Sequence, residues 1–358
     1  MRFIPSSCLK SGMIIAKNLY GNNNELMLSK GQILNDMEIN RIRLLEFQGI
    51  YITDNISADI EVNDIISSRL RNNTVKAVKD IFVNLENKEL PFNNEKIRTL
   101  KSMVDDIVDE ITVNPNAIIN MLDLKAFNDY TYYHSVNVAV LSIVVGVSLR
   151  LNKNELYKLG LGALLHDIGK VFIPIEILEK KGKLDDEEFK QIQQHSVKGS
   201  NYLKEKWDIS IESTIAILNH HEKYDGSGYP LKLKSEKISL FGKIIAVADV
   251  FDALTSNRSY RVAFSPSDAM EYIMGGSGTL FEPKIVSAFA KSVIPYPVGT
   301  CVELSNNLKG IVVDNHIGFC MRPKVRIIGN TNNGKEIYYD LYNDKNLLNV
   351  TIKGIAIM

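Results

Sequence analysis

The sequence predicts a mainly α-helical protein with small β-containing units at both ends. Between about residues 116 and 292 the apolar residues recur at helical spacing, and residues 138–149 are apolar on nearly all sides, as in buried helices. Short β-type runs separated by turn residues occupy both ends of the chain. With 358 residues, of which 45% are hydrophobic, the chain can fill two or three units.

Four units are expected in order: a small α+β unit over 1–58, a helical pair over 59–115, a helical domain over 116–294 and a β-rich unit over 295–358. The first unit contains one helix-like segment near residues 36–47 and could be regulatory. The pair consists of amphipathic helices over 62–86 and 96–111. They are predicted to be a linker or a dimerisation pair, although helices that only cap the core would show the same pattern.

Charge and cysteine content argue against several classes of protein. Lys plus Arg (42) balances Asp plus Glu (42), so no global basic field attracts a nucleic acid polymer or an anionic membrane. Cys8, Cys301 and Cys320 show no CxxC spacing, which fits a reducing compartment and argues against a thiolate metal site. The N-terminus lacks a signal-peptide core, and residues 138–149 are too short to span a bilayer. A soluble cytoplasmic protein without membrane insertion is therefore expected.

Most histidines gather in the predicted helical domain. Asp167 follows His166 at the end of an apolar helix, and Asp249 lies inside the apolar stretch IIAVADVFDAL. A buried ionised carboxylate is costly unless it is paired or binds a metal. Each residue alone is more often a hydrogen-bonded structural group, but together they indicate coordination. Five of the six histidines belong to this domain: His134, His166, His195, His220 and His221.

The adjacent pair His220 and His221 limits the shape of such a site. Neighbours on a helix point about 100° apart, so both can face one site only if it is broad or if the helix ends there. A two-metal centre is broad, with ions roughly 3.5 to 4 Å apart, and Asp167 could bridge the ions while His166 binds one. Imidazole and carboxylate ligands without thiolate suit iron, manganese, nickel or zinc, and the residues do not choose among them.

Five stretches of the chain stand in a familiar order: YTYYHSVNVA, HDIGK, LEKKGKLDDEEFKQIQQH, HHEKYDGSGYP and ADVFDALTSNRSYR. In these stretches the chain resembles the HD-GYP family, a bacterial branch of the HD phosphohydrolase superfamily. The resemblance covers roughly residues 116–292, about half of the chain. It implies an all-helical HD-type phosphohydrolase domain that degrades cyclic di-GMP at a metal centre, usually assigned as iron or manganese.

The resemblance also implies a ligand set. Some members have a Glu four residues before the first histidine and hold a third metal, whereas that position here is Tyr130. Two divalent ions are therefore expected, iron or manganese, with nickel or zinc left open. Asp167 is expected to bridge them. The implied metal ligands are His134, His166, Asp167, His195, His220, His221 and Asp249.

For the reaction, the resemblance implies that a metal-bridging hydroxide attacks phosphorus in line and opens cyclic di-GMP to linear pGpG, with GMP as a further product. Asp167 and Lys170 are expected to be catalytic, and Lys170 to contact a phosphate; a solvated lysine at a helix end is the alternative. Glu222 is expected to orient a ligand histidine without binding metal. The expected substrate contacts are Lys170, Gly228, Tyr229, Pro230, Arg258 and Arg261.

Arg258 and Arg261 match family positions that bind phosphate or guanine, and a forked guanidinium suits both. Exposed surface arginines are the alternative. In the GYP loop, residues 226–230, Gly226 and Gly228 permit tight turns of the backbone, and Pro230 stiffens the end of the loop.

Two other functions remain open: an HD phosphohydrolase acting on another nucleotide, and a catalytically silent cyclic di-GMP receptor. The GYP loop and the arginine pair argue against the first, and the complete ligand set argues against the second. The terminal units show no ligand or phosphoacceptor motif, so they could bind a regulatory protein. The helices over 62–111 could join two copies in a homodimer.

Overall fold

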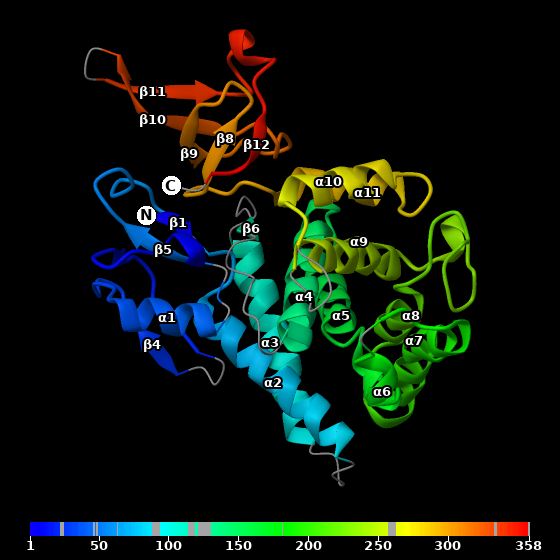
Figure 1. The fold of residues 1–358 in the computed structure, drawn as a ribbon. Coiled ribbons are helices and arrows are strands. Elements are labelled where there is room, and N and C mark those ends of the chain that lie inside the picture. The colour runs from blue at the N-terminus through cyan, green and yellow to red at the C-terminus, as the bar shows by residue number, and fades with distance from the viewer. Residues whose placement is uncertain are drawn as a thin grey trace.

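A central helical domain carries sheets at one end of the molecule (Figure 1). This computed structural model describes the chain except residues 22–24, 46, 48, 63, 88–93, 114–118, 121–129, 181, 257–262, 333–334 and 357–358. The helices of the domain are α4 (Tyr130–Ser148), α5 (Lys153–Leu164), the short 3₁₀ helix η3 (Ile168–Phe172), α6 (Ile175–Leu178), α7 (Asp186–Lys206), α8 (Ile211–Asn219), η4 (Ser235–Lys237), α9 (Leu240–Thr255), α10 (Pro266–Gly275) and α11 (Pro283–Ser292).

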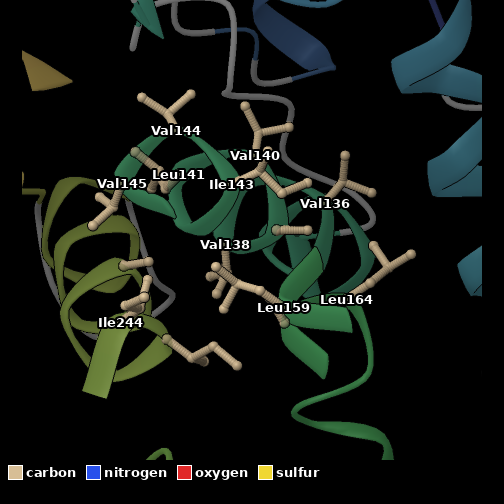
Figure 2. Close-up of a cluster of buried hydrophobic side chains, with 14 of the residues drawn as sticks. Val136, Val138, Val140, Leu141, Ile143, Val144, Val145, Leu159, Leu164 and Ile244 are labelled. Atoms are coloured by element: carbon tan, nitrogen blue, oxygen red, sulfur yellow. The ribbon is translucent and has the colours of Figure 1, made fainter. Parts of the chain in front are cut away.

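One hydrophobic core holds this domain together, with α4 in its middle. Val138, Leu141 and Val145 of α4 are fully buried, and α4 packs against α5 and α9 (Figure 2). The segment Thr131–Ser148 has the length and hydropathy of a membrane span, longer than the apolar run read from the sequence, and 72% of it is buried inside the protein. Its apolar surface thus belongs to the core.

The helical pair lies in that same core. Helices α2 (Ser68–Glu86) and α3 (Asn94–Val113) bury Val78 and Ile107 in the cluster that contains the α4 side chains. The apolar side chains of both helices thus contribute to the core of the domain, as in the alternative noted from the sequence, helices that cap the core. A role of residues 59–115 as a linker or a dimerisation pair stays a prediction.

Two short strands bring the ends of the helical domain together. Strand β6 (Ile119–Asn120) pairs in parallel with β7 (Val293–Ile294). The chain therefore enters and leaves the domain side by side.

The N-terminal region contains an antiparallel sheet in the order β1-β5-β2 and a second two-stranded pairing. The helix expected near 36–47 is α1, which begins at a capping box formed by Asn35 and Glu38. The elements are β1 (Arg2–Pro5), η1 (Ser6–Cys8), β2 (Ile14–Ile15), β3 (Leu19–Tyr20), β4 (Leu26–Leu28), α1 (Asp36–Leu44) and β5 (Gly49–Thr53).

The C-terminal region forms an antiparallel sheet in the order β11-β10-β9-β8-β12. Its elements are β8 (Cys301–Leu304), β9 (Lys309–Asp314), β10 (Lys324–Asn332), β11 (Lys335–Asp340), η5 (Lys345–Leu347) and β12 (Ile352–Ile355).

The two terminal regions pack against each other, and both chain ends lie at this junction (Figure 1). Phe3 and Tyr51 share a buried cluster with Cys301. The guanidinium of Arg326 on β10 donates to both carboxylate oxygens of Asp59, at 2.7 and 3.1 Å. Two units that are far apart in the sequence thus meet through an apolar cluster and a buried arginine.

Candidate metal centre

The predicted ligands converge from five places in the helical domain. All of them except the half-buried His221 are buried. His134 lies in α4, His166 and Asp167 in the turn between α5 and η3, His195 in α7, His220 and His221 directly after α8, and Asp249 in α9.

Two groups of potential ligand atoms share one carboxylate. Asp167 combines with His134 and His166 in one group, and with three further histidines in the other, and within each group the ligand atoms lie within 4.8 Å of one another. The Nε2 atom of His195 lies 3.5 Å from Asp167 Oδ1, whereas His166 Nε2 lies 3.4 Å from Oδ2. The two oxygens of Asp167 thus face different groups, as a bridging carboxylate requires. The second group is Asp167, His195, His220 and His221.

Asp249 closes the side of the cluster that faces α4. Its Oδ1 atom lies 3.2 Å from His134 Nε2, and its Oδ2 atom lies 4.0 Å from His221 Nδ1. Burial by itself raises the pKa of Asp249, but the hydrogen bond and charge of His134 outweigh it and lower that pKa. Asp249 is therefore an ionised carboxylate within reach of both groups.

Backbone carbonyls orient three of the histidines in the same way. Each ring donates its Nδ1–H to the carbonyl three residues earlier, so its Nε2 lone pair points into the cluster. This arrangement fixes the tautomer that binds a metal and is typical of ligand histidines. The pairs are His166 with Ala163 O (2.7 Å), His195 with Ile192 O (2.6 Å) and His220 with Ile217 O (2.6 Å).

The Nε2 atom of His166 shows that the cluster fits a metal. It is buried and has no hydrogen-bond partner among the described residues. Such an orphaned acceptor costs free energy, which a metal ion at this position removes. Nitrogen and oxygen ligands without sulfur suit a divalent ion of the first transition row.

The end of α8 explains how two adjacent histidines reach one site. The helix stops at Asn219, and His220 and His221 follow with their ring centroids 4.0 Å apart. Both rings lie near His195, with ring centroids 5.3 and 5.0 Å from it. The second condition stated for this pair, a helix that ends there, is therefore present.

Gly169 allows the HDIGK turn to lie directly on α7. A Cβ atom at this position would lie 1.8 Å from the carbonyl oxygen of His195 and 2.7 Å from the nitrogen of Gly199. Only glycine permits this approach, because both neighbours are backbone atoms that cannot rotate away. The contact sets the spacing between Asp167 and His195.

Glu222 contacts the loop rather than a histidine. Its carboxylate accepts the backbone N–H groups of Leu231 and Leu233 at 2.7 and 2.9 Å. These two bonds occupy one oxygen each and close the loop onto the segment that carries His220 and His221. The expected role of Glu222 in orienting a ligand histidine stays a prediction. The sequence showed the residue type but not its partner.

The GYP loop folds back over the second group of potential ligands. The N–H of Tyr229 donates to the carbonyl of His221 at 3.2 Å, and the two rings lie 4.7 Å apart. A Cβ atom on Gly228 would lie 2.3 Å from the nitrogen of Lys223, so this fold-back also requires a glycine. Pro230 follows Tyr229 through a cis peptide bond. Tyr229 and Pro230 therefore lie at the rim of the cluster.

Lys170 lies next to the shared carboxylate. Its Nζ donates to Asp167 Oδ2 at 2.5 Å, and its side chain is 36% exposed. Burial by itself raises the pKa of Asp167, but the Lys170 ammonium and the neighbouring histidines lower it well below its usual range. Lys170 thus links the cluster to solvent. Arg258 and Arg261, the other predicted substrate contacts, lie outside the described residues.

Sequence reasoning missed the partner of His134. Asp252 accepts the Nδ1–H of His134 at 2.7 Å, and its second oxygen accepts the Asn137 amide at 3.0 Å. A signal was present, because Asp252 follows Asp249 by three residues on the same buried helix and therefore points to a similar side. The carboxylate orients the histidine and increases its basicity.

The histidines make stability of the metal-free protein depend on pH. Burial lowers the pKa of His195, and that of His220 and His221 further, below the ordinary value of about 6.5. Unfolding below this pH takes up protons, so stability is lost as pH falls. Burial alone lowers the pKa of His134, but its hydrogen bonds to Asp249 and Asp252 raise it to about 9. The contribution of His134 to the stability of the folded protein is complete below pH 6.5 and disappears as pH rises through 9.

The EDTA-treated protein is therefore expected to melt at its highest temperature near neutral pH. Thermal unfolding between pH 5 and pH 9.5 measures this. In His221→Asn the decrease on the acidic side should be smaller, since one proton acceptor of the unfolded chain is gone. A melting temperature that is flat or rises toward pH 5 would contradict the assignment of three neutral histidines in the cluster.

Comparison with known proteins agrees with this fold. The HD domain family matches residues 116–285. The chain is 38% identical over 226 residues to a cyclic di-GMP phosphodiesterase of Pseudomonas aeruginosa, across 62% of this chain and 54% of that protein. It is 41% identical over 163 residues to a 3'3'-cGAMP-specific phosphodiesterase of Vibrio cholerae, across 46% of this chain and 37% of that protein.

Among solved structures, an HDG"Y"P protein from Bdellovibrio bacteriovorus aligns with a TM-score of 0.52 and 20% identity, over 80% of this chain and 97% of that one. At this identity the likeness concerns the fold alone. The helical fold and its buried His and Asp cluster define an HD domain. Within that class, the similarity to a protein named as a cyclic di-GMP phosphodiesterase confirms the resemblance to the HD-GYP family noted in the sequence. The chain spans about half of the Pseudomonas relative and less of the Vibrio relative.

Proposed function

We propose that the protein is a metal-dependent phosphodiesterase that hydrolyses cyclic di-GMP to linear pGpG and, on further hydrolysis, to GMP. The observation that carries the proposal is the pair of ligand groups that share Asp167. The similarity to a cyclic di-GMP phosphodiesterase supports the substrate. Two divalent ions, when bound, lower the pKa of water and polarise phosphoryl oxygens, and iron or manganese is the proposed pair.

The residues proposed to hold the ions divide between the two groups. His134 and His166 serve one ion, and His195, His220 and His221 serve the other. Asp167 would be the carboxylate that both ions share, and Asp249 would add a further carboxylate from α9. The three Nδ1–H bonds to backbone carbonyls hold Nε2 atoms in position before metal arrives, so little reorganisation accompanies binding.

Lys170 and Tyr229 are proposed to contact the cyclic dinucleotide. The Lys170 ammonium is partly exposed beside Asp167 and can attract a phosphate to the reacting position. Burial and the charges of Asp249 and Asp167 raise the pKa of Tyr229, so its hydroxyl keeps its proton and can donate to the substrate. Gly228 and Pro230 shape the loop around that ring, and Arg258 and Arg261 are proposed to bind a phosphate or a guanine.

Turnover of cyclic di-GMP tests this function. The protein is purified without oxygen, loaded with Mn²⁺ or Fe²⁺, incubated with cyclic di-GMP, and the products are separated by chromatography. We expect pGpG to appear first and GMP later. Tight binding of cyclic di-GMP without any product would instead indicate a silent receptor and would overturn the enzymatic proposal.

A second substrate follows from the similarity to the 3'3'-cGAMP-specific phosphodiesterase. The same assay with 3'3'-cGAMP compares the two rings under identical metal loading. We expect the higher kcat/KM for cyclic di-GMP; a reversed preference would assign the chain to the other substrate while retaining the reaction.

A further inference from the structure

We propose that Arg71 on α2 is a positioning residue of the metal centre, acting through Asn137 and Asp252 on the ring of His134. Its Nη1 donates to Asn137 Oδ1 at 3.3 Å. The Asn137 Nδ2 donates to Asp252 Oδ1 at 3.0 Å, and His134 Nδ1 lies 2.7 Å from Asp252 Oδ2. An unbroken chain of hydrogen bonds therefore leads from α2 to a predicted metal ligand.

The guanidinium at one end and the Asp252 carboxylate further along together set the direction of the bonds in this chain. A guanidinium can only donate, so Asn137 must turn its oxygen toward Arg71 and its NH₂ toward Asp252. Asp252 then accepts on both oxygens and holds the proton of His134 on Nδ1. The Nε2 atom of His134 faces Asp249 and Asp167, at 3.2 and 3.9 Å, where a metal would be bound.

Burial makes the chain sensitive to the loss of its first member. Arg71 is 6% exposed, Asn137 2% and Asp252 1%. Without the guanidinium, Asn137 Oδ1 loses that donor, and the amide is held less firmly against Asp252. Asp252 could then shift, and the ring of His134 would lose part of its fixed orientation. In a low-dielectric interior such networks are strongly coupled.

Arg71 lies outside the part of the chain that matches the HD domain family, since it precedes residues 116–285. Helix α2 also contacts η3, the turn that follows His166 and Asp167. One helix therefore touches both sides of the first ligand group, so a shift of α2 would change the geometry at His134.

The test measures binding of Mn²⁺ alone to the full chain, by the electron paramagnetic resonance signal of the free ion. We expect Arg71→Met to weaken Mn²⁺ binding by about tenfold or more, within the range for residues that orient metal ligands. The Mn²⁺ affinity of Arg71→Lys should lie between those of the wild type and Arg71→Met, because an ammonium can still donate but lacks the planar fork of the guanidinium. The inference rests on the proposed metal centre, but since no nucleotide is present, a failure to hydrolyse cyclic di-GMP leaves this result unaffected.

Two control variants on the same helix separate positioning from stability. Arg69→Met removes an exposed arginine, and Val78→Ala removes packing from a fully buried position. Both should leave the Mn²⁺ dissociation constant within twofold of wild type, although Val78→Ala lowers the melting temperature. If Arg71→Met also lowers the melting temperature but leaves the Mn²⁺ dissociation constant within twofold of wild type, the inference is overturned.

A double-mutant cycle decides the case in which Arg71→Met does not fold. Arg71→Lys and Asn137→Ala are measured alone and together. If the two residues act through one chain, the effects on Mn²⁺ affinity are less than additive. Additive effects would show that Arg71 does not act through Asn137 and would overturn the inference.

Discussion

Replacing Asp167 with asparagine is expected to lower the turnover of cyclic di-GMP by on the order of 1000-fold or more. The amide keeps the size of the side chain but removes the charge that two ligand groups share. It also offers an NH₂ group where Asp167 accepts from Lys170. Steady-state kinetics under saturating Mn²⁺ measure the loss.

A matched control is Asp186→Asn, which makes the same chemical change at an exposed position in the first turn of α7. Its activity should equal that of the wild type. If Asp167→Asn retains activity within tenfold of wild type, Asp167 is not the shared ligand, and the proposed reaction centre is wrong.

Replacing Gly169 with alanine is expected to destabilise the protein by about 3 kcal/mol and to abolish activity. The added methyl group would lie 1.8 Å from the carbonyl oxygen of His195, so η3 and α7 must move apart. That movement separates Asp167 from His195. Unfolding in urea measures the stability, and metal content measures the effect on the site.

Gly275→Ala is the matched control for this change. A Cβ atom at Gly275, the last residue of α10, meets nothing within 4 Å. The substitution should therefore be neutral or slightly stabilising. Equal stability of the two alanine variants would contradict the claim that the HDIGK turn requires a glycine for contact with α7.

Local patterns in the sequence predicted the helical domain, and the resemblance to the HD-GYP family supplied the set of clustered histidines. All-round apolar helices such as α4 have to be buried, and an Asp beside a His in such surroundings needs a partner. The end of α8 at Asn219, which lets His220 and His221 face one cluster, was one of the two conditions stated for that pair.

What the sequence could not predict were partners distant along the chain. The spacing in α2 showed an apolar face but not that the face joins the core around α4. The buried cluster that contains both Phe3 and Cys301, and the bond between Asp59 and Arg326, join segments from opposite ends of the chain. A buried carboxylate in the sequence indicates only that it needs a hydrogen-bond donor. The tertiary structure decides which donor it finds: the loop N–H groups for Glu222 and the ring of His134 for Asp252.

The most direct test of the central claim is the number of metal ions bound per chain. The protein is reconstituted anaerobically with Mn²⁺ or Fe²⁺, separated from free ions by gel filtration and analysed by plasma mass spectrometry. Two ions per chain are predicted for the wild type, with clear loss in Asp167→Asn, because the two groups share that carboxylate. A wild-type content near zero, or a content that Asp167→Asn leaves unchanged, would contradict a two-metal centre bridged by Asp167.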